Sequence, residues 1–286
     1  MKEVVITLTT VDTMTDIFMI YLYKENGLHS NANTMIVMIA INTFIQLLIV
    51  LAVNKKKGWK TLLKEWLLTL LFLRPFIDAW RVHNKHEDSE TTVNPLAAMI
   101  MNKGIELATE SIPGCVLQCY VLLFNPYLGS GSGPIISIGI SAFMTGLTSA
   151  MIAYDMDTDL PHRAKQPLFY GYIKNGSEQR GQTFLLMTMI STLHNLSRSL
   201  GYAILAVVNL NLALKFFVGE VGAYLLYKIV RRDFYYWVRL EGVLSVIISL
   251  VERTLVKTIT DFTVSGDARS VRKMCIWRQS LTYIIF

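Results

Sequence analysis

Hydrophobic residues occur in long blocks that are separated by short polar segments. An α-helix of about 20 apolar residues spans the roughly 30 Å hydrocarbon core of a bilayer. A helix of a soluble bundle would keep a polar face, and the longest of these blocks lack one. The pattern therefore predicts an all-α, polytopic helical membrane protein. The predicted spans are Val4–Tyr23, Met35–Val53, Leu107–Phe124, Pro134–Tyr154, Thr183–Leu210 and Phe216–Val230.

The stretch Met101–Phe124 begins as an amphipathic helix and ends as an apolar one. Its polar face recurs at three- and four-residue steps, which is the period of a helix. That face comprises Lys103, Glu106, Glu110, Gly114 and Gln118.

A proline interrupts this helix just after the deeper acid, Glu110. Pro113 has no N–H and frees the carbonyl of Thr109, so it bends a helix. We expect a kink at Pro113 and Gly114.

Basic residues predict which loops face the cytoplasm. Five lysines lie between Lys55 and Lys64, and the loop 155–181 is also basic. Under the positive-inside rule both segments are cytoplasmic, and so is the N-terminus, which lies two spans before the lysines. Leu107–Phe124 and Pro134–Tyr154 then form a hairpin that leaves and returns. The short run Trp66–Trp80 is expected to be interfacial or re-entrant, with a full crossing as the alternative.

This topology gives one transmembrane domain over residues 1–286, with about six to seven spans and one or two re-entrant or interfacial helices. Its predicted parts are a first hairpin (1–53), a cytoplasmic-side linker with the interfacial helix (54–106), the kinked hairpin (107–154), a cytoplasmic loop (155–181) and C-terminal helices (182–286). Beyond Phe234 the pattern weakens, although Leu240–Val256 is long enough for a further span. The chain stops in an apolar run, which suggests a missing final hairpin or a longer protein.

Composition agrees with the membrane class and argues against several others. Hydrophobic residues make up 52% of the chain and charged residues 17%, below the quarter that is usual in soluble domains. The net charge of +6 is concentrated in loops, which indicates membrane orientation and not nucleic-acid binding. Three cysteines provide neither a disulfide framework nor a metal-ligand spacing.

Enzyme motifs are not found. The sequence has no His-Glu-x-x-His, no Gly-x-Ser-x-Gly and no phosphate-binding glycine loop, so we expect no enzyme and no cofactor. Asp155, Asp157 and Asp159 begin like a calcium loop. Leu160 and Gln166 then stand where that loop needs glycine and glutamate, so no metal is expected.

Charged residues inside the predicted spans demand an explanation. An ionised side chain at the centre of a membrane helix costs about 2.5–3.5 kcal/mol, so five of them facing lipid would cost roughly 12–18 kcal/mol. They must face the bundle interior, pair, protonate or meet water. The five are Asp12, Asp16, Glu110, Arg198 and Glu220.

Two interpretations of these charges remain open. The first is a structural network in which Arg198 pairs with Glu110 or with an aspartate. The second is a hydrophilic path through the membrane, lined by the five charges and Gln118. Glu106 and His194 carry less weight, because an acid near the interface and a helix-packing histidine have ordinary structural uses.

Several segments are similar to the XK-related family of membrane proteins, which includes phospholipid scramblases. Glu110-Ser111-Ile112-Pro113, followed by Val116-Leu117-Gln118, resembles that family's Glu-Ser-x-Pro-Gln-x-x-Leu-Gln helix. Asp12-x-x-x-Asp16 resembles its acidic first helix, and Leu196-Ser197-Arg198 resembles part of a later arginine-bearing helix. The Ser- and Ala-rich span at Ile136–Tyr154 falls where the family has a similar one. Gly114 departs from the pattern, since glutamine is usual there, and the family's last helices are not evident after Leu250.

The resemblance implies movement of phospholipids between leaflets, with headgroups sliding along a polar groove. It implies that Asp12, Asp16, Glu110, Gln118 and Arg198 line or brace that groove. Membrane phospholipids are then the expected partners, together with a second membrane protein or another copy of the chain, and the plasma membrane is the expected location. A proton-coupled or solute carrier that uses Asp12, Asp16 and Glu220 is the alternative, as is a non-transporting scaffold or accessory subunit.

Overall fold

Helices make up the architecture. The computed structural model describes residues 2–54, 58–71, 73, 77, 102–125, 127, 132–158 and 177–231, and no strand occurs among them. The elements in chain order are α1 (Lys2–Glu25), α2 (His29–Val53), α3 (Trp59–Leu70), a π-helical turn (Leu107–Ser111), α6 (Ile112–Phe124), α7 (Ser132–Thr158), α9 (Ser177–Val208) and α10 (Leu210–Arg231).

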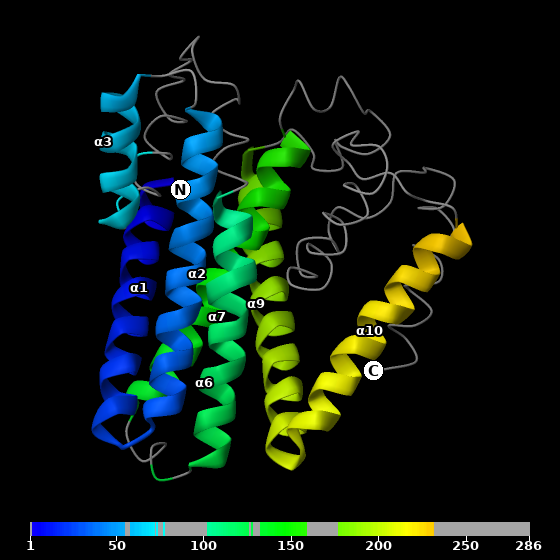
Figure 1. The fold of residues 1–286 in the computed structure, drawn as a ribbon. Coiled ribbons are helices and arrows are strands. Elements are labelled where there is room, and N and C mark those ends of the chain that lie inside the picture. The colour runs from blue at the N-terminus through cyan, green and yellow to red at the C-terminus, as the bar shows by residue number, and fades with distance from the viewer. Residues whose placement is uncertain are drawn as a thin grey trace.

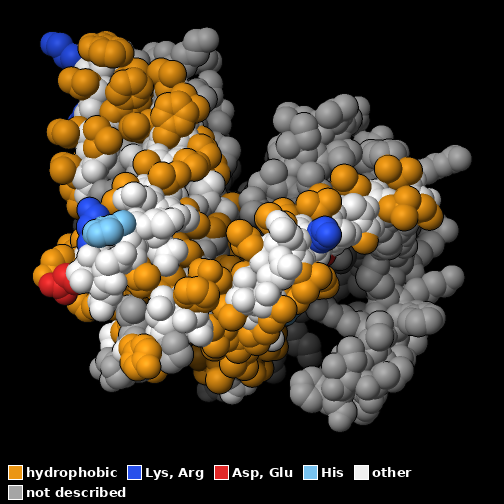
Figure 2. Space-filling model, turned by 60° about the horizontal axis from the view of Figure 1, so that its bottom comes forward, with side chains coloured by type: hydrophobic (Ala, Val, Ile, Leu, Met, Phe, Trp, Pro, Cys, Tyr) orange, Lys and Arg blue, Asp and Glu red, His pale blue; other side chains and the backbone are white. Residues whose placement is uncertain are grey.

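Three of these segments are long and apolar enough to cross a membrane: His29–Leu51, Asn102–Phe124 and Gly133–Met151. The second of them joins the π-helical turn and α6 into one helix. Many large hydrophobic side chains are exposed, and they form extended patches on the face shown in Figure 2, as expected of a protein that faces lipid. The membrane class predicted from the sequence is therefore supported, whereas six or seven spans stay a prediction.

Most of the long helices stand side by side, and α10 leans away from them (Figure 1). α1, α2, α6, α7 and α9 form the upright bundle, while α10 diverges from the base of α9. The chain reverses between α1 and α2, between α6 and α7 and between α9 and α10 at the same end of the bundle, at the bottom of Figure 1. This is the alternation that the predicted hairpins require; which end faces the cytoplasm stays a prediction.

The helices are longer than their apolar blocks. α2 begins at His29 and not at Met35, so the connection from α1 shrinks to a tight turn. Gly27 makes that turn with a positive φ of 73°, and the Leu28 N–H donates to the carbonyl of Tyr23 at 2.8 Å. Hydropathy marks only the apolar part of a helix, so polar first turns are missed.

α10 is extended in the same way. It begins at Leu210 and not at Phe216, directly after Asn209. The side-chain oxygen of Asn209 accepts a hydrogen bond from the Asn211 N–H at 2.8 Å, which satisfies a free donor at the helix start.

α7 continues into the predicted cytoplasmic loop. It ends at Thr158, so Asp155 and Asp157 lie in a helix and not in a calcium-like loop. The predicted loop 155–181 is shortened further because α9 begins at Ser177. Among the described residues, no group of three His, Cys, Asp or Glu side chains could hold a metal ion.

α3 covers only part of the predicted interfacial run Trp66–Trp80. Its 12 residues extend about 18 Å, which is too short to cross a bilayer, and it packs against α2. Most of that run after Leu71 lies outside the described residues, as does the whole chain beyond Arg231.

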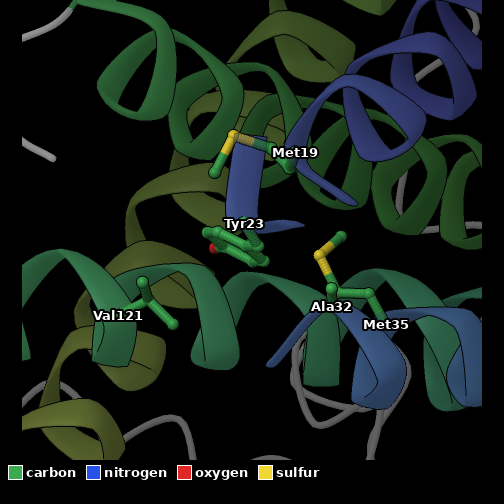
Figure 3. Packing of buried hydrophobic residues seen from close by; sticks show 5 residues of the cluster. All are labelled: Met19, Tyr23, Ala32, Met35 and Val121. Carbon is green, nitrogen blue, oxygen red and sulfur yellow. The ribbon is translucent and has the colours of Figure 1, made fainter. Parts of the chain in front are cut away.

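Apolar contacts hold the hairpin end of the bundle together. Figure 3 shows Met19 and Tyr23 of α1 between α2 and α6, with Ala32 and Met35 on one side and Val121 on the other. All five are buried, so α1 is fixed against both neighbours below the polar residues described next.

A small-residue contact joins α7 to α9. A Cβ atom added to Gly146 would lie 2.2 Å from the Thr192 hydroxyl oxygen and 2.5 Å from the Thr192 backbone nitrogen. The two helices approach this closely only because residue 146 has no side chain.

Candidate functional site

α1 places two carboxylates in the interior of the bundle. Asp12 and Asp16 are four residues apart and therefore share one face of the helix. Their side chains are only 6% and 5% exposed. The predicted first helix thus turns its acids inward, as the cost of an ionised group in lipid requires.

Asp16 contacts α6 directly. The side-chain amide of Gln118 on α6 donates to Asp16 Oδ1 at 3.0 Å, and the Ser137 hydroxyl of α7 donates to Gln118 Oε1 at 3.2 Å. All three side chains are buried. One hydrogen-bonded chain therefore links α1, α6 and α7 across the bundle.

The irregularity of the 102–124 helix lies at Glu110. Residues Leu107–Ser111 form a π-helical turn, closed by a hydrogen bond from the Ile112 N–H to the carbonyl of Leu107. α6 continues directly from this turn, with Pro113 as its second residue. Because proline has no N–H, Pro113 donates no bond to the preceding turn of this continuous helix. The sequence predicts a bend just after Glu110, whereas in the structure the π-helical turn includes Glu110 itself. Such turns are frequent at functional sites.

α2 supplies the partner of Glu110. The side-chain amide of Asn42 donates to Glu110 Oε2, and the amide of Gln46 donates to Asn42 Oδ1 at 3.1 Å. Asn42 and Gln46 are buried, whereas Glu110 is half-buried. These amides are the polar groups that hold the carboxylate between α2 and the helix Asn102–Phe124.

Near the start of the same helix lies an ion pair. Lys103 Nζ lies 2.8 Å from Glu106 Oε1 and 2.9 Å from Glu106 Oε2. Asp12 is within electrostatic reach of both of these side chains. Among the described residues, Asp12 Oδ1 finds no hydrogen-bond partner although it is buried.

These contacts define one site, which we call the acidic cluster. Its carboxylates interact electrostatically with one another, and Lys103 is the cation beside them in the described part of the chain. Among the described residues, acidic groups therefore outnumber cations at this site, which suits an interior that receives a cation, a proton or the cationic part of a headgroup. The carboxylates are those of Asp12, Asp16, Glu106 and Glu110.

Arg198 and Glu220 form a second, separate group between α9 and α10. Arg198 Nη2 lies 2.7 Å from Glu220 Oε2, and the Tyr202 hydroxyl donates to the same oxygen at 2.6 Å. The guanidinium also lies over the Tyr202 ring, 5.5 Å from its centroid. The Arg198 and Glu220 side chains are 20% and 27% exposed. A pairing of Arg198 with Glu110 or with an aspartate, which the sequence left open, is not what the structure shows.

His194 stands one turn before Arg198 on α9 and is half-buried. Its role in a polar path stays a prediction.

Sequence reasoning missed three members of the site: Asn42, Gln46 and Ser137. A usable signal was present for the first two, because they are amides four residues apart inside an otherwise apolar span. Ser137 carried no such signal, since α7 is rich in serine and threonine throughout.

Comparisons with known proteins identify no relative: neither a protein-family model, nor a curated protein, nor a solved structure matches the chain. The similarity to the XK-related family therefore depends on the short motifs alone. Three helices of sufficient length and hydrophobicity indicate an integral membrane protein, and the site indicates that its interior is polar.

Proposed function

We propose that this chain is an XK-related-like membrane protein of six or seven spans that moves phospholipids between leaflets. The observation that supports the proposal is the hydrogen bond between Asp16 and Gln118. It joins the acidic first helix to the Glu-Ser-x-Pro…Gln helix, which are the two segments on which the motif resemblance depends. The two sequence motifs alone do not predict that these helices are in contact.

The acidic cluster supplies the polar surface that a headgroup needs inside a bilayer. Carboxylates and amides replace water around the headgroup, while the acyl chains stay in hydrocarbon. Arg198 and Glu220 brace the neighbouring α9–α10 pair and provide a further charged position. The N-terminus is cytoplasmic in this proposal, and the plasma membrane is the membrane concerned.

Movement of lipid requires the cluster to open. Asp12, Asp16 and Gln118 are covered by surrounding helices, and α1 packs against both α2 and α7. A headgroup reaches them only when α1 separates from these neighbours. The described structure is then the closed state of a gated path, and an activator or partner shifts the population toward the open state.

A vesicle assay tests the proposal. The purified full chain is reconstituted with fluorescent phospholipid, and a membrane-impermeant quencher is added outside. Transport predicts quenching that continues beyond the outer leaflet. Anionic lipid and candidate partners are supplied in the assay. If the extent of quenching is then no greater than in protein-free vesicles, the proposal is rejected.

Burial of the carboxylates favours a second candidate, a proton- or cation-coupled carrier. Such a carrier has a closed site within the membrane, and Asp12 and Asp16 are almost inaccessible. Uptake of solute driven by a pH gradient, without lipid movement, would select this candidate.

A further inference from the structure

α3 has one face buried and one face exposed. Leu62, Glu65 and Thr69 are buried, and α3 packs against α2. They lie three or four residues apart, so they form one side of the helix. Residues on the opposite side of α3 are exposed.

The exposed side of α3 carries large apolar residues in a stripe, which we call the α3 stripe. Trp59, Leu63, Leu67 and Leu70 are 65%, 55%, 57% and 53% exposed. They follow one another at three- and four-residue steps and therefore stand one above the other. The Trp59 ring also meets the Trp66 ring edge to face, with 6.2 Å between the ring centroids, so an aromatic pair extends over the first two turns of α3.

Lysines border the α3 stripe. At 100° per residue, Lys60 and Lys64 fall on the edge of the stripe, away from the buried face, and both are exposed. Lys55, Lys56 and Lys57 precede them in the sequence, directly after the apolar helix α2. Glu65 is the acid within residues 54–70, and it lies on the buried face.

Tryptophans with leucines beside a row of lysines suit the boundary between hydrocarbon and headgroups. Tryptophan prefers that boundary, and lysine extends its ammonium group toward phosphate while its stem stays in the apolar layer. Four to eight basic residues immediately after a membrane-spanning helix attract anionic lipids. A soluble protein partner would explain the leucines and not the row of like charges.

We propose that the lysine edge of α3 is a binding site for anionic phospholipid headgroups, with the α3 stripe inserted beside them. The occupant is the lipid of one leaflet, which contributes phosphate or carboxylate groups to the ammonium groups and acyl chains to the stripe. The site is distinct from the acidic cluster and makes the protein responsive to leaflet composition. It does not depend on the proposed transport activity.

Lipid binding to the full chain in detergent tests the site. Native mass spectrometry measures binding of short-chain phosphatidylserine and phosphatidylcholine to the wild type and to K60Q/K64Q. Each lysine near an anionic surface contributes about fivefold in affinity, so the double variant should lose phosphatidylserine affinity by roughly 25-fold. The affinity for phosphatidylcholine should change little.

K24Q/K215Q is the matched control, because it also removes two exposed lysines, from the helical turns at the opposite end of the bundle. It should bind phosphatidylserine like the wild type. An equal loss in both double variants, or equal binding of the two lipids by the wild type, would overturn the proposal. So would binding of soluble glycerophosphoserine as tight as that of the lipid, because the α3 stripe would then contribute nothing.

Discussion

Asp16 on α1 and Gln118 on α6 are 102 positions apart in the sequence and 3.0 Å apart in the structure, where the amide of Gln118 donates to the carboxylate. Both side chains are buried, so the bond forms away from competing water. Its loss should be costly, since a buried acceptor without a donor is penalised more than the bond itself stabilises.

The first prediction concerns this bond. Gln118→Leu removes the donor to Asp16 and the acceptor for Ser137, and should lower the free energy of unfolding by about 1–3 kcal/mol. Denaturant unfolding in detergent measures the change. Thr43→Val is the control, because the Thr43 hydroxyl donates to the carbonyl of Ile39 on its own helix. Equal stability of the two variants would show that the Asp16–Gln118 bond contributes nothing.

A second prediction concerns the contact between α7 and α9. Gly146→Ala places a methyl group against the Thr192 hydroxyl and backbone, so it should destabilise the protein by about 1–3 kcal/mol. Gly139→Ala makes the same change on the exposed side of α7, where an added Cβ meets nothing within 4 Å. That variant should be neutral or gain roughly 0.5–1 kcal/mol. A Gly146→Ala protein as stable as Gly139→Ala would disprove the close approach.

The third prediction concerns the α9–α10 ion pair. Arg198→Gln and Glu220→Gln should each weaken the attachment of α10, and the double-mutant cycle should show a coupling of about 0.5–3 kcal/mol. Hydrogen exchange of the α10 amides reports the change locally, because α10 leans away from the bundle and contacts α9. Additive effects of the two substitutions would contradict a direct interaction.

A fourth prediction separates structure from transport at the acidic cluster. Asparagine and glutamine are isosteres that keep hydrogen-bonding capacity but lose the charge. Asp12→Asn and Glu110→Gln should therefore leave the unfolding free energy within about 1 kcal/mol of the wild type while slowing transport by roughly tenfold or more. The two readouts are thermal unfolding and the vesicle assay. If transport is unchanged and only folding or expression suffers, the scaffold or accessory interpretation replaces the transport proposal.

The membrane class, the order of the helices and the inward-facing acids of α1 were predictable from the sequence, because they follow from hydrophobic period and from the cost of charge in lipid. The pairing of Arg198 with Glu220 was not, since several carboxylates were eligible and only the packing of α10 on α9 selects one. The π-helical turn at Glu110 was also not predictable from the sequence. Pro113 indicated an irregularity but did not show that the chain would widen before the proline.

Helix ends were predicted least well, because they depend on local hydrogen bonds that the hydrophobic pattern does not record. The start of α10 depends on the capping bond from Asn209, and the polar first turn of α2 follows the tight turn at Gly27; hydropathy records neither feature. The role of the Asn42 and Gln46 amides could not be predicted either, because it depends on a tertiary contact between Asn42 and Glu110.

The most direct test of lipid transport through the acidic cluster compares the wild type with Asp16→Asn in the fluorescent-lipid vesicle assay, at equal protein density. The asparagine side chain of that variant still offers an oxygen to the Gln118 amide, so the fold is kept while the charge is removed. We predict quenching beyond the outer leaflet with the wild type and a loss in rate of roughly tenfold or more with the variant. Quenching by both proteins at the same rate, or by neither beyond protein-free vesicles, would contradict transport through this cluster.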